Sequence, residues 1–244
     1  MILKSRQDGV LILTLDRPAQ RNAMSSGLVH ALIDAIEAAG TDDSVGAVLV
    51  TGAGRGFCAG SDLAGLAAMT ADEQSSFEEE SGRAARMLGL CPKPVVAGVH
   101  GFAIGGGLTL ATSCDIVVTE AASRWSLPEV PIGLFPAWGL GSVIARVGAP
   151  AARRLSWGLD MLDGHEAVRL GLADILAAGD VQEEAMALAR RLAALPRSQT
   201  EAVKRYFATH VPDSASDEQA NRLFMAAVSS SEAQASFRKF SGKS

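Results

Sequence analysis

Apolar residues recur along the first half of the chain with two periods, one typical of strands and the other typical of helices. Strict alternation over 10–15 predicts a strand. Apolar residues spaced by three and four over 28–36 predict an amphipathic helix, with Ser25 or Ser26 as its N-cap. The run VGAVLVTGAG (45–54) is almost continuously apolar, which is typical of a strand buried on both faces.

The same strand–helix–strand unit recurs further along. Helices are predicted over 72–90 and 106–113, and strands over 94–99 and 115–119. Several crossover units of this kind indicate an α/β chain.

From about Gly148 onward the pattern is helical, with almost no strand between the helices. We therefore expect two regions: an α/β core over 1–195 that carries the functional site, and a helical region over 196–244. The apolar faces of the second region have little of their own to cover, so it should pack on the core or on a neighbouring subunit.

Three consecutive glycines, Gly105 to Gly107, lie inside the most apolar stretch of the chain (94–118). The stretch is long enough to suggest a membrane span, but His100 and Asp115 interrupt it and it contains five glycines. We expect no membrane span. A buried strand, a loop and a buried helix in succession fit the pattern better.

Composition argues against several classes of binding partner and indicates a cellular compartment. The 244 residues are 48% hydrophobic, carry a formal net charge of -5 and contain no run of Lys or Arg, which argues against nucleic-acid or anionic-membrane binding. Cys58, Cys91 and Cys114 lack the spacing of metal ligands, so no metal site is expected. We expect reduced thiols and, because the N-terminus lacks the features of a signal peptide, a cytoplasmic location.

Two glycine-rich loops are the candidates for chemistry. TGAGRGFCAGSDL (51–63) fails the dinucleotide-binding fingerprint, because Phe57 stands at the third glycine position and no clean helix opens there. FAIGGGLTLA (102–111) follows a strand and opens a helix, whose first N–H groups have no partner within the helix. Glycines there can simply allow tight packing. If both loops converge, however, their N–H groups form a two-donor pocket for a thioester oxygen that becomes an enolate.

Five sequence blocks in order resemble the crotonase family, the enoyl-CoA hydratases and isomerases. They cover nearly the whole chain: DRPAQRNAMS (16–25), FCAGSDL (57–63), HGFAIGGGLTLATSCD (100–115), SLPEVPIGLFPAWG (126–139) and DGHEAVRLGLAD (163–174). The resemblance implies the crotonase fold, which is a spiral of ββα units with a C-terminal helical trimerisation region. It also implies a homotrimer or a dimer of trimers.

The resemblance implies an acyl-CoA thioester as the substrate, with CoA as part of that substrate and no separate cofactor. On the family pattern, the oxyanion N–H donors fall on Ser61 and Gly106. The CoA moiety would lie along a set of mostly backbone contacts at Arg21, Ala23, Ala59, Asp62 and Leu63, and Lys239 or Lys243 could meet its phosphates.

The acid/base positions decide which reaction is expected. Family hydratases carry two glutamates that share one water, and the corresponding positions here are Thr109 and Glu129. Burial among apolar neighbours would raise the pKa of Glu129 toward the range useful for proton transfer. Isomerisation needs only one carboxylate, which removes a proton from C2 and returns it at C4. We therefore favour a 3-enoyl/2-enoyl-CoA isomerase with Glu129 as a single acid/base.

Several alternatives stay open at this point. The chain could be an enoyl-CoA hydratase, another enzyme of the fold such as a decarboxylase or thioester hydrolase, or an inactive CoA-binding or assembly protein. Thr109 could orient a water. A second acid could reach the pocket from the charged run 72–80, although such a run is more often a solvated face: Asp72, Glu73, Glu78, Glu79 and Glu80.

The remaining polar and aromatic candidates carry weaker signals. The four histidines show no partner pattern and are expected to be structural or on the surface: His30, His100, His165 and His210. Three aromatic residues around the PE segment line an acyl pocket or pack in the core, and the pattern favours neither: Trp125, Phe135 and Trp138.

Overall fold

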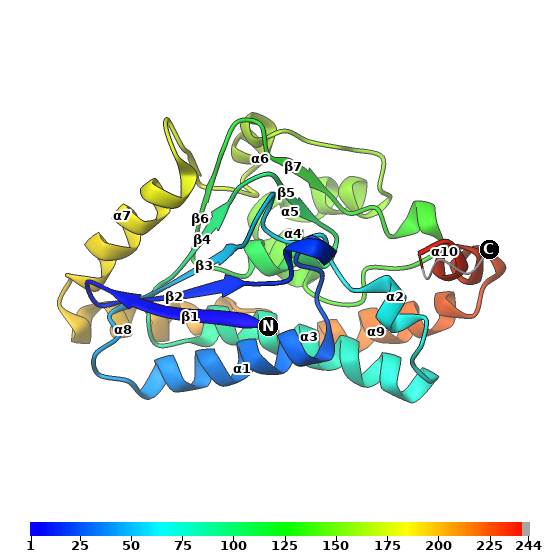
Figure 1. Ribbon diagram of the computed structural model, residues 1–244, viewed down its shortest axis with the longest axis horizontal. Helices are drawn as coiled ribbons and strands as arrows, with labels where there is room; N and C mark the ends of the chain where they lie inside the picture. The colour runs from blue at the N-terminus through cyan, green and yellow to red at the C-terminus, as the bar shows by residue number, and fades with distance from the viewer. Residues whose placement is uncertain (241–244) are drawn as a thin grey trace.

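A six-stranded sheet runs through the middle of the computed structural model, which describes residues 1–240 (Figure 1). β1 pairs with β2 in antiparallel fashion, and all later neighbours are parallel. In spatial order the strands are β1 (Ile2–Gln7), β2 (Val10–Leu15), β3 (Ala47–Gly52), β4 (Val95–Val99), β6 (Ile116–Thr119) and β8 (Ile175–Leu176).

A second, two-stranded sheet is formed by β5 (Phe102–Ile104) and β7 (Arg124–Ser126), which run parallel. Each follows a strand of the large sheet and is in turn followed by a helix. The chain thus repeats a strand–strand–helix unit, as the resemblance implied: β1–β2–α1, β4–β5–α4 and β6–β7–α5.

The central strands are buried on both faces because helices cover both. On one face, Leu13 and Val50 belong to the main core under α1 (Ser26–Thr41) and α3 (Ala71–Leu90). On the other, Leu49 and Val96 pack against α7 (Val181–Ala193). Figure 1 shows α1 and α3 below the sheet and α7 at its left end. This arrangement explains why 45–54 is continuously apolar.

Three short helices, one longer helix and two single turns complete the part of the chain before α7. They are α2 (Leu63–Leu66), α4 (Gly106–Thr112), α5 (Leu140–Ser156) and α6 (Gly164–Leu170), with single turns η1 (Pro18–Gln20) and η2 (Val130–Ile132). All strands and helices predicted before Gly148 are present. The sequence pattern did not predict β1, because only Ile2 of that strand is buried. It also did not predict the strands of two or three residues, such as β5, which are too short to show a period.

The C-terminal helices pack on the core of the same chain. They are α8 (Arg197–Phe207), the turn η3 (Ala208–His210), α9 (Ser214–Val228) and α10 (Ser231–Phe240). On α8, buried Lys204 donates to Asp115 at 2.6 Å and to the Leu88 carbonyl. α9 packs against α3 and α5, and α10 packs against α2 and η2, so both reach the region of the glycine loops.

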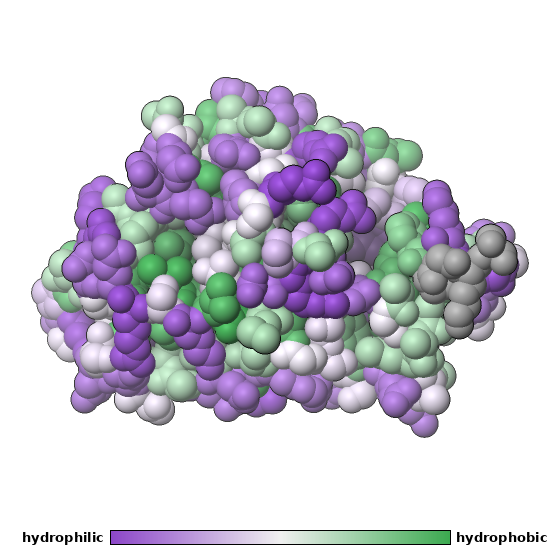
Figure 2. All heavy atoms as spheres, in the orientation of Figure 1, coloured by the Kyte–Doolittle hydropathy of each residue, from purple (hydrophilic) through white to green (hydrophobic). Residues whose placement is uncertain are grey.

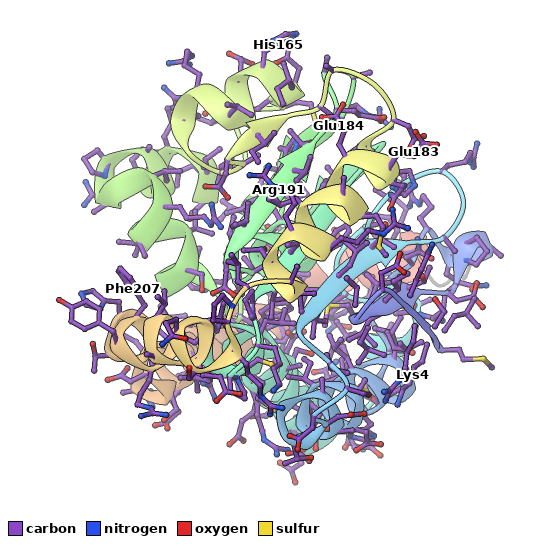
Figure 3. All side chains as sticks on the ribbon, turned by 90° about the vertical axis from the view of Figure 1, so that its left-hand side faces the viewer. Lys4, His165, Glu183, Glu184, Arg191 and Phe207 are labelled. Carbon is purple, nitrogen blue, oxygen red and sulfur yellow. The ribbon has the colours of Figure 1, made fainter. Side chains whose placement is uncertain are left out.

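Part of α8 stays apolar and exposed in the single chain. Val203, Tyr206 and Phe207 are each more than half exposed, at 57%, 71% and 56%. Figure 3 shows Phe207 pointing away from the body of the protein. None of the helices within residues 1–240 is both long and apolar enough to cross a membrane.

Candidate active site

The two glycine-rich loops meet at a cavity of about 80 Å³. A groove of about 560 Å³ continues from it. The two share six lining residues: Ala59, Ser61, Leu63, Ile104, Pro128 and Ile132. Apolar side chains from five parts of the chain enclose the cavity: Leu63, Leu66, Ile104, Ile132, Leu134, Phe135, Trp138 and Phe224. The cavity is therefore a mostly apolar pocket with a wider approach.

Convergence of the loops is direct. Gly60 has a φ of 92°, and a Cβ placed on it would lie 3.2 Å from the Gly106 nitrogen. Both Ser61 and Gly106 line the cavity, and within the described residues neither of their N–H groups has a hydrogen-bond acceptor. Gly106 begins α4, where a backbone N–H lacks an intrahelical partner. Two backbone donors are thus available to one ligand oxygen.

At each of the three consecutive glycines, a side chain would collide with a different neighbour. Gly105 has a φ of 55°, and a Cβ on it would lie 2.6 Å from Oε1 of Glu129. On Gly106 a Cβ would lie 2.9 Å from Cζ2 of Trp138. On Gly107 it would lie 2.2 Å from the Cys58 carbonyl oxygen, which belongs to the other loop. Gly107 therefore allows tight packing of the two loops, whereas Gly106 leaves its backbone N–H accessible from the cavity.

Glu129 presents a carboxylate oxygen to the cavity. It immediately precedes η2 and lines the cavity, and its Oε2 is buried without a hydrogen-bond partner among the described residues, although the residue as a whole is partly exposed. Burial raises the pKa of Glu129 to about 7. Near neutral pH this group can therefore accept and release a proton.

Glu78, from the charged run on α3, is a second carboxylate in the cavity. It is 2% exposed, and the indole Nε1 of Trp138 donates to its Oε2 at 2.8 Å. Burial raises the pKa of Glu78 to about 8; the nearby Glu129 adds to the rise, while the Trp138 indole and the Ser61 hydroxyl oppose it. The alternative that an acid from the run 72–80 reaches the pocket therefore holds for Glu78, and Glu129 is not the only carboxyl group that lines the cavity.

The helical period of α3 carried a signal for Glu78. Buried positions on this helix recur at Gln74, Phe77, Glu78 and Ser81, so Glu78 occupies the inward stripe. The other acids of the run do lie at the surface, and Glu80 contacts His30 there. The interpretation of the run 72–80 as a solvated face therefore holds for its other acids but not for Glu78.

Thr109 lines the cavity, but its hydroxyl is engaged. It donates to the Gly106 carbonyl at 3.1 Å. Its side chain packs on Gly139, where a Cβ would lie 2.5 Å from the Thr109 Cβ. These contacts favour the interpretation of Thr109 as an ordinary buried helix position over that of a water-orienting group.

The residues expected to bind CoA border the wider groove. All five line it: Arg21, Ala23, Ala59, Asp62 and Leu63. Asp62 also forms an ion pair with Arg17 at 2.8 Å and caps α2 through the Gly65 N–H. Figure 2 shows the surface recessed between η1 and α10. Lys239 lies in the last turn of α10, while Lys243 lies outside the described residues.

Of the aromatic and histidine candidates, only two aromatic residues reach the cavity. Phe135 and Trp138 line the cavity, whereas Trp125 is a fully buried core residue whose indole donates to Ser123. Within residues 1–240, no histidine lines the cavity, and no three His, Cys, Asp or Glu side chains are grouped as a metal site.

Comparison with known proteins agrees with this geometry. A model of the family described as enoyl-CoA hydratase/isomerase matches residues 5–244. The chain is 35% identical to the 2,3-dehydroadipyl-CoA hydratase of Escherichia coli over 194 residues, which cover 79% of this chain and 75% of that protein. It is 34% identical to the short-chain-enoyl-CoA hydratase of Clostridium acetobutylicum, over 71% and 67% of the two chains.

Solved structures show the same arrangement of elements. A crystal structure of an enoyl-CoA hydratase/isomerase from Mycobacterium paratuberculosis superposes with a TM-score of 0.90 at 27% identity, covering 98% of this chain and 97% of that one.

Proposed function

Because the chain belongs to the enoyl-CoA hydratase/isomerase family, whose members act on CoA thioesters, we propose that it moves the double bond of a 3-enoyl-CoA to the 2-position. The observation that carries this proposal is the unpartnered, buried Oε2 of Glu129 in an apolar cavity that also holds two free backbone N–H groups.

In the proposed reaction, the thioester oxygen accepts hydrogen bonds from the N–H groups of Ser61 and Gly106. Glu129 removes a proton from C2, and the electrons move into the carbonyl to give a dienolate with its charge on that oxygen. Backbone donors aimed at the developing charge stabilise the transition state more than the ground state. The wider groove, with Arg21 and Asp62 at its edge, holds the CoA moiety.

Two features favour isomerisation over hydration. In the family's hydratases two carboxylates hold the water, and at the first of these positions Thr109 offers only a neutral hydroxyl, which donates to the Gly106 carbonyl and cannot act as a base. Glu78 has a pKa of about 8, so near pH 7 it is mostly a neutral acid rather than a second anionic acceptor.

Hydration is the second candidate, for two specific reasons. The relatives named above are called hydratases, and Glu78 supplies a second carboxyl group in the cavity. A neutral Glu78 could protonate C2 while Glu129 takes a proton from water, which would replace the usual pair of glutamates by a different pair.

The deciding experiment supplies purified protein with a 3-enoyl-CoA and, separately, a 2-enoyl-CoA. Migration of the double bond without a gain of water is the result we expect. Addition of water to the 2-enoyl-CoA at a higher kcat/KM than migration would replace our proposal by the hydratase. Loss of CO2 from a suitable acyl-CoA or release of free CoA would indicate the decarboxylase or the hydrolase, and CoA binding without turnover an inactive binding protein.

The rate of isomerisation should depend on the ionisation of Glu129. Its carboxylate form is the base, and burial raises its pKa to about 7. We therefore expect kcat/KM to fall about tenfold for each pH unit below that value. A profile of kcat/KM from pH 4 to 8 tests this; an acidic limb near the ordinary glutamate pKa of 4.5 would contradict the assignment.

We also propose that the chain assembles as a trimer or a dimer of trimers, supported by the exposed apolar side chains Val203, Tyr206 and Phe207 on α8. Light scattering should then give a mass about three or six times that of one chain. A mass equal to one chain at micromolar concentration would exclude this assembly.

A further inference from the structure

Glu78 is buried in a way that structural stability alone does not explain. The groups that act on its charge are the Trp138 indole, the Ser61 hydroxyl and Glu129, and none of them is a cation. A buried carboxyl group without a cationic partner destabilises the folded state when it ionises. On α3, an apolar residue in this inward position would pack without that cost.

Trp138 fixes the position of the Glu78 carboxyl group, and the surrounding contacts fix Trp138 in turn. Its indole N–H donates to Glu78 at 2.8 Å. The next residue, Gly139, donates its backbone N–H to Asp217 of α9 at 2.9 Å, and Asp217 also pairs with Arg86 of α3. The indole that holds the Glu78 carboxyl group therefore belongs to a turn that α9 and α3 hold in place.

The absence of a side chain at Gly82 allows this arrangement. Gly82 lies one helical turn after Glu78 on α3, and a Cβ on it would lie 3.1 Å from the Cβ of Trp138 and 2.9 Å from Oδ2 of Asp217. The closeness of these contacts shows that the turn carrying Trp138 sits directly against α3.

We propose that Glu78 is the acid that protonates C4 of the dienolate, and that Trp138 is its positioning residue. This inference rests on the proposed isomerase function. Glu129 takes the proton from C2; the carbonyl then re-forms, the C2–C3 double bond forms, and the former C3–C4 π electrons take the proton of Glu78 at C4. Glu78 is left as a carboxylate and Glu129 as the acid, and exchange of protons with water resets both.

Two carboxyl groups suit a proton shift between C2 and C4, because these carbons are not adjacent and one group must otherwise move between them. The two groups here come from different elements, Glu78 from α3 and Glu129 from the segment before η2, and both line the same cavity. In the proposed reaction each group serves one carbon. The sequence resemblance placed neither glutamate of a hydratase pair on α3.

Glu78→Gln is the central test, with Glu79→Gln as the matched control. The amide oxygen of glutamine can still accept the Trp138 N–H, so the variant should fold, whereas Glu79 is exposed on the next position of the same helix. Isomerisation of 3-enoyl-CoA should fall about 100-fold or more in Glu78→Gln and stay within about threefold of wild type in Glu79→Gln.

The decisive second readout is the exchange of C2 hydrogen in D2O, measured on recovered 3-enoyl-CoA by mass spectrometry. Glu78→Gln should keep C2 exchange within about threefold of wild type while isomerisation is lost, because Glu129 still removes the proton. Unchanged isomerisation, or equal loss of exchange and isomerisation, would overturn the role of Glu78 while the proposed function stands. No isomerisation by the wild-type protein would overturn the proposed function itself, and this inference with it.

Trp138→Phe tests the positioning role. The charged or titratable groups near Glu78 and Trp138 are Glu129 in the cavity, and Asp217 and Arg86 beside the turn of Trp138. Because the indole N–H lowers the pKa of Glu78, its removal should shift the alkaline limb of kcat/KM to higher pH. A lower rate with an unmoved limb would mean that Trp138 acts through packing alone.

Discussion

Glu129→Gln should reduce isomerisation by about a thousandfold and should abolish C2 exchange as well. The amide cannot accept the C2 proton, and without that step no dienolate forms for the backbone donors to stabilise. Stopped-flow or coupled absorbance at the wavelength of the conjugated thioester measures the first effect, and deuterium incorporation at C2 measures the second. Affinity for a saturated acyl-CoA should change little, since the groove residues are untouched.

Comparison of Glu129→Gln with Glu78→Gln separates the roles of the two carboxyl groups. If Glu129 is the C2 base, its amide variant loses both exchange and isomerisation, whereas the Glu78 variant loses only the second. Glu129→Gln should also keep or gain stability, because an unpartnered buried carboxylate oxygen is replaced by a neutral amide. Exchange that survives in Glu129→Gln would require another base.

Gly107→Ala should destabilise the folded protein by about 3 kcal/mol or more, even though it adds a single methyl group. The new Cβ would lie 2.2 Å from the Cys58 carbonyl oxygen and 2.8 Å from the Cys58 carbonyl carbon. These are backbone atoms of the first glycine loop, which cannot turn aside as a side chain can. Relief of the clash must move α4 and that loop apart, and the N–H groups of Ser61 and Gly106 would then separate.

Gly27→Ala is the matched control for this experiment. Gly27 lies in the first turn of α1, and a Cβ on it would meet nothing within 4 Å. Alanine there should leave activity unchanged and raise the free energy of unfolding by about 0.5 kcal/mol. Urea unfolding followed by circular dichroism compares the two variants. Equal stability of Gly107→Ala and wild type would show that the loops do not pack as described.

The fold was readable from sequence wherever one element was long enough to show a period. The alternation in β2 and the inward stripe of α1 each follow from burial of one face against a core. The three-residue strands β5 and β7 have no period of their own, and their pairing depends on segments about twenty residues apart. β1 is an edge strand with exposed side chains, held through its backbone pairing to β2.

The site divides in the same way. The sequence by itself determined the family and the two glycine loops, and through the resemblance it predicted the donors at Ser61 and Gly106 and the acid/base Glu129, because all of these lie in contiguous sequence blocks. Only the tertiary structure decided that Glu78 enters the cavity and that Trp138 holds it there. The two residues are sixty positions apart, and burial, which sets the pKa of Glu78, exists only once α3 and the turn of Trp138 have packed together. The sequence of α3 alone therefore predicts a solvated Glu78, and only packing against the turn of Trp138 excludes water from its carboxyl group.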